Sequence, residues 1–390
     1  MIPFDVDYVQ AATAAEAIAA WSEATAEGKT PRYFGGGTEI VTMARDNKLA
    51  ADVLIDYKRV PETRVGAVQR RAPGAARSTA ADPADAGGAA IATDPGITDA
   101  NPVASGRFGA ALRLNEIADT GAFALLGHCA AGVADRTVRN SITLGGNIAG
   151  MLPYREAVLP FLLLDGTVTT AAPAATTVSG GDPPRAAAGA PGARGSRASA
   201  ARGSSAPAAP TATNAAPPRI RTLPIIDLFD KRLRTDPGEL LLSCEIDPGI
   251  VHGLEADGVT TGDRGWGPRQ AWATGPRGGW FYLRRTKEPR LDYPLVTIVI
   301  AILDGAWRVA LSGAFGYPLR AVAAEQVLND ARPDAGGRFD DAAIRDLAVT
   351  ALDAEALSYR EDMRGSREYR RQMTIDALAT GIGRLARGEQ

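Results

Sequence analysis

The sequence predicts an α+β fold from three observations. Residues 32–56 read as strand, glycine cluster, helix and strand, which is how an α/β unit begins. Further along, two β-rich runs at 296–302 and 307–311 flank Asp304-Gly305, a pair that favours a tight hairpin. Helical patterns follow that hairpin, so we expect a small C-terminal sheet that is backed by helices.

Helix-end signals and periodicity place the other elements. Residues 13–16 have the form of a capping box, and Gly28 suits the end of the helix that follows. A strand at 141–144 is expected to run into a second glycine cluster. Pro318 suits the first turn of a helix that reaches about Leu328. The remaining predicted elements are strands at 32–34 and 53–56 and helices at 38–46, 156–164, 340–353 and 366–387.

Three segments differ from the rest in composition. Residues 67–107 and 171–219 are dominated by Ala, Gly, Pro, Ser and Arg. Such segments bury too little apolar surface to offset a backbone ordering cost of ~1–2 kcal/mol per residue, so we expect both to be disordered insertions. Residues 248–279 are Gly-rich but contain Trp266 and Trp272, which predicts a linker or insertion with partial order.

The totals exclude several classes of protein. The chain has 390 residues, enough for two or three domains, and a net charge of −2 that indicates no nucleic-acid partner. Its longest apolar run, 157–164, is far shorter than the ~20 residues that span a membrane. The N-terminus lacks the basic and apolar regions of a secretory signal. We therefore expect a cytoplasmic protein without a membrane span.

The chain has few residues that could ligate a metal. Its only cysteines and histidines are Cys129, Cys244, His128 and His252. An iron–sulfur cluster needs about four thiolates, and a zinc site needs a Cys/His spacing that is missing here. An enzyme built on this chain must therefore obtain its chemistry from a cofactor, a partner or both.

The first glycine cluster is Gly35-Gly36-Gly37, followed by Thr38 and Glu39. Glycines after a strand allow a phosphate to approach the backbone, and the next helix offers N–H groups to an anion. The cluster lacks the Gly-Lys-Ser/Thr ending of a nucleoside-triphosphate loop and the spacing of the dinucleotide fingerprint. Taken alone, it is also compatible with an ordinary tight turn.

The second cluster is Gly145-Gly146-Asn147, and the amide of Asn147 offers both a donor and an acceptor. This cluster alone is again compatible with a turn. Two anion-binding loops in one chain, however, suit a ligand with two linked phosphates, such as FAD.

Several motifs resemble those of the FAD-binding subunits of molybdenum hydroxylases. That family includes the flavin portions of xanthine dehydrogenase, aerobic carbon monoxide dehydrogenase and 4-hydroxybenzoyl-CoA reductase. The motifs occur in the family's order, and only the low-complexity segments fall outside the resemblance. They are residues 34–39, 53–61, 138–140, 143–148, 237–241, 292–296 and 362–371.

The resemblance implies which residues contact the cofactor. In the family, a carboxylate after the second loop meets the FAD ribose; an Asp is common there, whereas this chain has the longer Glu156. A carboxylate at a helix start is an equally good interpretation of Glu156. The implied FAD contacts are Gly35, Gly36, Gly37, Thr38, Glu39, Gly145, Gly146, Asn147 and Glu156.

The resemblance also implies a domain organisation. It predicts a two-subdomain FAD-binding domain of the vanillyl-alcohol-oxidase-like (PCMH) type, followed by a small antiparallel sheet with helices. The implied boundaries are subdomain 1 at 1–60, subdomain 2 at 61–247, the Gly-rich linker or insertion at 248–279 and the C-terminal α+β domain at 280–390.

The function implied is electron transfer within a complex. A molybdopterin-binding large subunit and an iron–sulfur small subunit with 2Fe–2S clusters would be the partners. FAD on this chain would pass electrons to NAD or another acceptor, and no side chain here would act as a catalytic acid or base. Two alternatives remain: a stand-alone flavin-dependent oxidoreductase, and a structural subunit that has lost its flavin.

Other conspicuous residues have structural interpretations. Arg139 is expected to brace the second loop, and His128-Cys129 to be a core pair. Arg284 and Lys287 are expected at a solvated basic rim, and residues 364–371 at an interface or on a solvated helix face.

Overall fold

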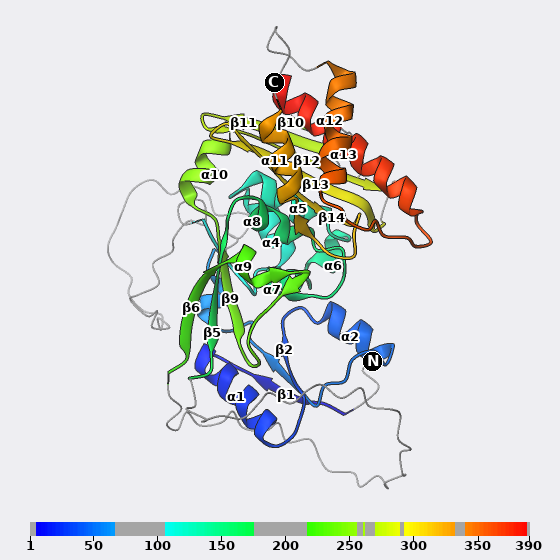
Figure 1. Cartoon of the computed structure of the whole chain (residues 1–390). Helices are drawn as coiled ribbons and strands as arrows, with labels where there is room; N and C mark the ends of the chain where they lie inside the picture. The colour runs from blue at the N-terminus through cyan, green and yellow to red at the C-terminus, as the bar shows by residue number, and fades with distance from the viewer. Residues whose placement is uncertain are drawn as a thin grey trace, which may run out of the picture.

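A computed structural model describes residues 5–66, 106–174, 217–255, 260–261, 270–288, 292–331 and 340–387. Trp266 and the interiors of both low-complexity segments lie outside the described residues, so the expectation of disorder there is untested. In the described part, three larger sheets follow one another from the N-terminal end of the molecule to the C-terminal end (Figure 1).

The first sheet is parallel, with strand order β1-β3-β2. As the sequence predicts, Thr13 begins α1 by accepting a hydrogen bond from the N–H of Glu16, and Gly28 follows the end of the helix with a φ of 75°. The elements are β1 (Asp7–Gln10), α1 (Ala14–Ala26), β2 (Pro31–Phe34), α2 (Thr38–Arg45), β3 (Val53–Asp56) and the short 3-10 helix η1 (Pro61–Arg64).

The second sheet is antiparallel, with strand order β4-β9-β5-β6. Its strands are β4 (Arg107–Gly109), β5 (Thr167–Ala172), β6 (Arg219–Pro224) and β9 (Leu240–Glu245). Ala172 pairs with Arg219 across β5 and β6, and Arg107 begins β4. The predicted boundaries of both insertions were therefore wrong, because they included residues that belong to strands. Composition misled there because small residues such as Ala171 are buried within a strand.

Short helices lie between this sheet and the C-terminal one (Figure 1). They are α4 (Leu114–Thr120), α5 (Ala124–Gly132), α6 (Arg136–Arg139), α7 (Leu144–Ala149), η2 (Glu156–Val158) and α8 (Leu159–Leu163). The predicted helix at 156–164 is confirmed as η2 and α8. A small hairpin of β7 (Phe229–Asp230) and β8 (Arg232–Leu233) follows α9 (Ile225–Leu228), and α10 spans Pro248–Leu254.

The predicted strand at 141–144 is wrong. Thr143 instead caps α7, because its side chain accepts a hydrogen bond from the N–H of Gly146. The segment makes one isolated β-bridge, between Thr143 and Arg113. The alternation of Ile142 and Leu144 reflects burial against the 110–114 segment and not a continuous ladder.

The third sheet is antiparallel and six-stranded, with its strands in sequence order from β10 to β15. They are β10 (Thr260–Thr261), β11 (Gln270–Gly275), β12 (Gly278–Thr286), β13 (Pro294–Leu303), β14 (Ala306–Ser312) and β15 (Leu319–Arg320). The hairpin at Asp304-Gly305 is confirmed: both residues have positive φ, 51° and 82°, as a tight type I′ turn requires.

Two expectations about this region were wrong. The sheet begins before residue 280, because β11 pairs with β12 along its length; the Gly-rich segment is thus in part sheet. Pro318 does not enter a helix, because the chain remains extended to pair β15 with β14. Helix α11 starts only at Val322 and ends at Asp330. The predicted helices at 340–353 and 366–387 are confirmed as α12 (Asp341–Ala354) and α13 (Arg367–Arg387).

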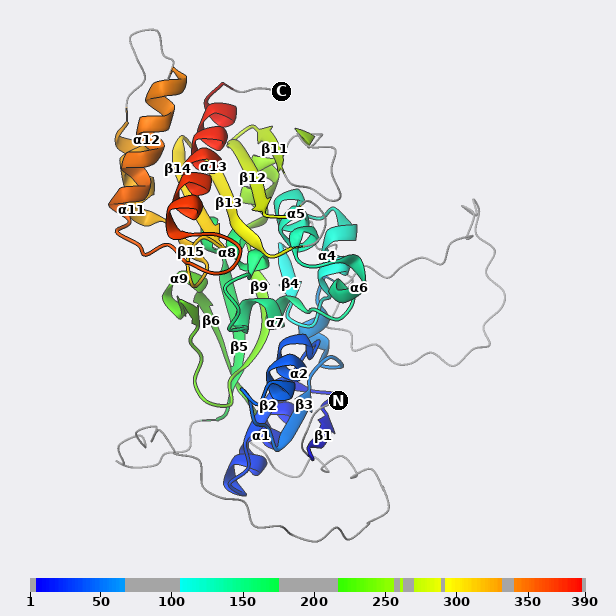
Figure 2. The ribbon, with the colours of Figure 1, turned by 90° about the vertical axis from the view of Figure 1, so that its right-hand side faces the viewer.

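The C-terminal sheet is covered on both faces. Helices α11, α12 and α13 pack on one face, while α5 and α8 approach the other (Figure 2). Alternation along β12 sends Trp280 and Tyr282 into the larger core, shared with the N-terminal regions, and Phe281 and Leu283 into the smaller core under α11–α13. No helix among the described residues has the length and apolarity to cross a membrane.

Candidate functional site

The first glycine cluster forms the turn from β2 into α2. Gly37 occupies the N-cap position with a φ of 72°, a left-handed conformation that glycine adopts without strain. No hydrogen bond from a described side chain caps α2. The N–H groups of its first turn have no intrahelical partner and are directed outward from the helix end. This turn is therefore suited to bind an anion.

The structure brings the two glycine clusters into contact. A Cβ atom on Gly36 would overlap the carbonyl oxygen of Ser141, just before the second cluster. A Cβ on Gly35 would lie 2.6 Å from the hydroxyl oxygen of Thr143 and 2.7 Å from that of Tyr57. Burial raises the pKa of Tyr57 to about 12, so its hydroxyl stays protonated at neutral pH. The two clusters thus form one continuous surface.

The second cluster lies inside α7 and not in a loop. The N–H groups of Leu144 and Gly145 donate to the carbonyls of Leu112 and Ala110, both at 2.8 Å. These donors are therefore used within the protein. The N–H of Gly146 makes only a long 3.2 Å bond to the Thr143 hydroxyl.

Gly146 is less closely packed than the other glycines of the two clusters. A Cβ there would meet only the Thr143 hydroxyl, at 3.0 Å, among the described atoms within 4 Å. Glycine inside a helix costs roughly 1 kcal/mol relative to alanine. The neighbouring Asn147 has a structural role: its side-chain oxygen accepts a hydrogen bond of 3.2 Å from the N–H of Ala157.

Glu39 connects the two clusters. From the first turn of α2, its carboxylate accepts a hydrogen bond of 2.8 Å from the N–H of Met151, just beyond α7. A Cβ on Gly150 would lie 2.5 Å from the other carboxylate oxygen. The geometry therefore supports a bracing role for Glu39.

Lys58 and Asp56 stabilise the first cluster through hydrogen bonds. The Lys58 ammonium donates to the Gly35 carbonyl at 3.0 Å and to Asp56 at 2.7 Å. Burial alone would raise the pKa of Asp56, but hydrogen bonds from Lys58 and Tyr8 outweigh burial and hold that pKa below its ordinary value. This support was missed as a site feature, although Lys58 lies in one of the recognised motifs.

Glu156 is buried and lies beside Arg284. Its side chain is 1% exposed, and its carboxylate faces the guanidinium of Arg284 at 3.5 Å. Arg284 was expected at a solvated rim, yet its side chain is only 15% exposed. The correction has a physical reason: β12, the strand that carries Arg284, packs against α5, which the sequence did not reveal.

An open cavity of about 400 Å³ adjoins the end of α7 and was not predicted from the sequence. Arg155 in its wall donates to the carbonyls of Leu152 at 2.7 Å and Ile148 at 3.2 Å. Burial lowers the pKa of Arg155 to about 10. The cavity is mainly basic; its lining is Met151, Arg155, Asp230, Lys231, Arg232, Arg234, Gly316 and Tyr317.

The other conspicuous residues are structural. Arg139 donates to Asn115 at 2.9 Å and to the carbonyls of 133 and 134, so it braces the segment that leads to the second cluster. Cys129 is buried in the core, and burial together with Glu156 raises the pKa of its thiol well above the ordinary value. Arg370 is fully buried and not on a solvated face, because it bonds the carbonyls of Leu295 and Gly313. Within the described ranges, no three His, Cys, Asp or Glu side chains gather as a metal site.

The two glycine clusters thus meet in the N-terminal part of the fold, and the C-terminal part contains an antiparallel sheet covered by helices on both faces. Residues 103–179 match the family described as the FAD binding domain in molybdopterin dehydrogenase. Over this segment, the match confirms the resemblance found in the motifs. FAD is the cofactor that the family description gives.

Solved structures share the fold over the full chain. One is quinoline 2-oxidoreductase from Pseudomonas putida 86, with 17% identity and a TM-score of 0.60 over 100% of this chain and 99% of that chain. Another is carbon monoxide dehydrogenase from Hydrogenophaga pseudoflava, with 18% identity and a TM-score of 0.61 over 100% and 99%. A third is reconstituted CO dehydrogenase from Oligotropha carboxidovorans, with 17% identity and a TM-score of 0.60 over 99% of this chain and 99% of that chain. No curated protein gives a significant match.

Proposed function

We propose that this chain is the FAD-binding electron-transfer subunit of a molybdenum-containing hydroxylase or dehydrogenase complex in the cytoplasm. The observation that carries the proposal is the contact between the two glycine clusters. It creates one surface with, on one side, the first N–H groups of α2, which no described side chain caps, and, on the other side, Gly146, where a Cβ would meet only the Thr143 hydroxyl among the described atoms. A diphosphate needs both features: donors for its oxygens and a backbone without side chains.

The proposed site assigns a role to every expected residue except Glu156, which is buried beside Arg284. Gly36, Gly37 and the N–H of Thr38 would bind phosphate oxygens at the start of α2. Gly146 would leave room for the diphosphate to approach α7. Other residues would hold these contacts in place: Gly35 and Gly145 by close packing, and Asn147 and Glu39 by their hydrogen bonds. FAD supplies reversible uptake of electrons, and this chain binds and orients it.

We retain the two-subdomain division of the FAD-binding half as part of the proposal. Separate sheets support it: the parallel sheet falls within 1–60, and the antiparallel sheet β4-β9-β5-β6 falls within 61–247. The C-terminal boundary needs adjustment, because β11 already belongs to the C-terminal sheet.

Partners follow from the chemistry that this chain lacks. With two cysteines in all, the chain cannot ligate an iron–sulfur cluster by four thiolates. We infer that a large subunit carries the molybdenum cofactor and a small subunit carries 2Fe–2S clusters. Electrons would pass through FAD to NAD or another acceptor. The similar structures, a quinoline oxidoreductase and carbon monoxide dehydrogenases, support this class of complex.

The first experiment tests the cofactor. The full chain, purified from an FAD-replete host, should carry close to one FAD, and acid precipitation should release all of it to the supernatant. Flavin that stays on the pellet would contradict non-covalent binding. Protein of normal stability without flavin, even after reconstitution, would favour the structural-subunit alternative.

The second experiment tests the partners. The isolated chain should transfer electrons from a reduced nicotinamide to a dye at most, and should hydroxylate no purine, aldehyde or other candidate substrate. Co-purification from the native host should yield two further polypeptides that contain molybdenum and iron. Substrate oxidation by the single chain, with neither metal detected, would favour a stand-alone flavoenzyme.

A further inference from the structure

Glu156 and Arg284 lie where the FAD-binding half meets the C-terminal sheet. Trp280, Tyr282 and Arg284 alternate along β12 and therefore point to the same side, toward α5. Glu156, the first residue of η2, faces them, and its carboxylate is the acidic partner of the Arg284 guanidinium at 3.5 Å.

Unsatisfied polar atoms concentrate around this pair. Among the described residues, buried polar atoms without a hydrogen-bond partner include both carboxylate oxygens of Glu156, the Nε of Arg284, the hydroxyl of Tyr282 and the Nδ1 of His128. The His128 ring stacks on Tyr282, with 5.9 Å between ring centroids. Such groupings are rare in protein interiors. Ordered water commonly completes the hydrogen bonding of buried groups like these.

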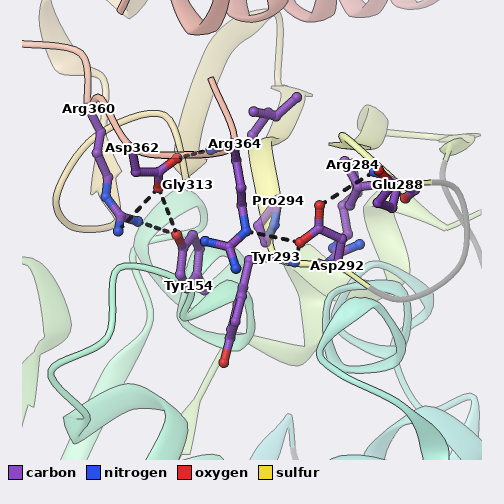
Figure 3. Close-up of polar contacts among 12 residues, drawn as sticks. Tyr154, Arg284, Glu288, Asp292, Tyr293, Pro294, Gly313, Arg360, Asp362 and Arg364 are labelled. Atoms are coloured by element: carbon purple, nitrogen blue, oxygen red, sulfur yellow. Dashed lines mark hydrogen bonds and ion pairs between the residues drawn. The ribbon is translucent and has the colours of Figure 1, made fainter. Parts of the chain in front are cut away.

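The residue next to Glu156 links the pair to the second glycine cluster by a hydrogen bond. Ala157, next to Glu156, donates its N–H to the side chain of Asn147. On the other side, Arg284 donates to the Asp292 carbonyl at 2.7 Å, and Arg364 bonds the Asp292 carboxylate at 3.0 Å (Figure 3). Glu156 is therefore connected to Asn147 through the hydrogen bond of its neighbour, Ala157.

The segment before Glu156 is held by the same C-terminal region. Tyr154 stacks on Tyr293 at 4.5 Å between ring centroids, and its hydroxyl contacts Arg360 and Asp362 (Figure 3). The chain that leaves the second glycine cluster is thus anchored twice on the C-terminal part. Both anchors are buried: Tyr154 is 8% exposed and Glu156 is 1% exposed.

We propose that the buried Glu156–Arg284 pair is a positioning element that holds the second glycine cluster against the C-terminal sheet, so that cofactor affinity depends on it although neither side chain touches the cofactor. The functional part of this inference rests on the proposed FAD site. Removal of one partner from a buried ion pair leaves an uncompensated charge, whereas removal of both does not. The effects of substituting the two side chains on stability should therefore be strongly non-additive.

The experiment is a double-mutant cycle in the full chain with Glu156→Gln, Arg284→Met and both together. Three quantities are measured: the melting temperature of the flavin-free protein, amide hydrogen exchange of residues 144–149, and the dissociation constant for FAD. We expect each single variant to lower the melting temperature by about 5 °C or more. Exchange at 144–149 should accelerate, and FAD binding should weaken at least about tenfold. The double variant should melt at no lower a temperature, and bind FAD no more weakly, than the more strongly affected single variant.

A matched control and a conservative variant complete the test. Asp304→Asn breaks an exposed ion pair with Arg277 in the same sheet and should change all three readouts little. Glu156→Asp keeps the charge and should retain most of the protection at 144–149, which also covers the case that Glu156→Gln fails to fold.

Three results would overturn the proposal. One is strict additivity of the two substitutions in the flavin-free protein. Another is unchanged exchange at 144–149 in the folded single variants. The third is loss of FAD affinity in Glu156→Gln without any change in the flavin-free protein, because that pattern indicates direct cofactor contact. Absence of FAD binding in the wild type would defeat the functional part of the proposal, while melting and exchange still decide the structural part.

Discussion

The two glycine clusters look alike in the sequence but differ in the structure. At the first, packing requires glycine: Gly36 lies against the Ser141 carbonyl, and no described side chain caps the first donors of α2. At the second, the first donors of α7 are used within the protein, and nothing described around Gly146 excludes a side chain. A glycine pattern therefore indicates close approach to the backbone. Only the fold distinguishes approach by the chain itself from approach by a ligand.

We expect the largest loss of stability and FAD binding from the addition of a single methyl group at the first cluster. In Gly36→Ala, the new methyl group would overlap a backbone oxygen that cannot move without displacing residues 141–143. We expect a loss of about 3 kcal/mol or more in the free energy of unfolding, together with loss of FAD. Thermal unfolding and flavin absorbance measure the two effects.

Gly127→Ala is the matched control for that variant. Gly127 lies inside α5, and its Cβ would make only an ordinary contact, 3.9 Å from the Ala118 carbonyl. Alanine there should leave stability unchanged or raise it by up to ~1 kcal/mol. If Gly36→Ala were as stable as this control, the first cluster would not be packed as described.

As the pH falls, the interactions that hold the second cluster should weaken at a higher pH than those that hold the first. Burial lowers the pKa of His128, beside the Glu156–Arg284 pair, from 6.5 to about 4. The unfolded chain therefore binds a proton at a higher pH than the folded chain. The stability that depends on neutral His128 is present above about pH 6.5 and is lost as pH falls toward 4, by at most about 3 kcal/mol.

Under the first cluster, the pKa of Asp56 is below its ordinary value of 3.8, so that support is lost only as pH falls below 3.8. Hydrogen exchange at pH 7 and pH 5 should therefore show faster opening of 144–149 at the lower pH, after correction for intrinsic rates, with little change at 38–45. His128→Asn should remove much of that difference. Equal acceleration of both segments would end the distinction.

Gly146→Ala separates ligand binding from packing. A methyl group there meets only the Thr143 hydroxyl, so we expect stability within about 1 kcal/mol of the wild type. FAD affinity should nevertheless fall about tenfold or more, because the methyl group would occupy the proposed approach of the diphosphate. Titration of the flavin-free protein measures this change. Unaltered affinity would remove Gly146 from the site and leave the first cluster as the main anion-binding element.

The smallest effect should come from a segment outside both clusters. Residues 176–214 connect β5 and β6, which pair with each other in the sheet. Closure entropy depends only weakly on loop length, so replacement by a short Gly/Ser linker should leave the melting temperature and FAD affinity nearly unchanged. A melting temperature several degrees lower would show that the segment contributes to packing.

Local signals in the sequence predicted local structure well. The Thr13 cap, the Asp304-Gly305 turn and the two C-terminal helices are encoded within a few residues, and the structure confirms each of them. The errors arose where local signals compete. Pro318 is compatible with a helix start, but strand pairing with β14 keeps it extended. Residues 141–144 alternate like a strand, but the Thr143 cap starts a helix.

What the sequence determined by itself was the class of fold, the two glycine clusters and, through ordered motifs, the family that the domain match confirms. These features depend on residue type and short spacing. The tertiary structure alone decided that Gly36 contacts Ser141, that Glu39 reaches Met151 and that Glu156 is buried beside Arg284. Each of these contacts joins segments far apart in the chain, and no local preference specifies them. They are fixed only when the sheets and helices pack together.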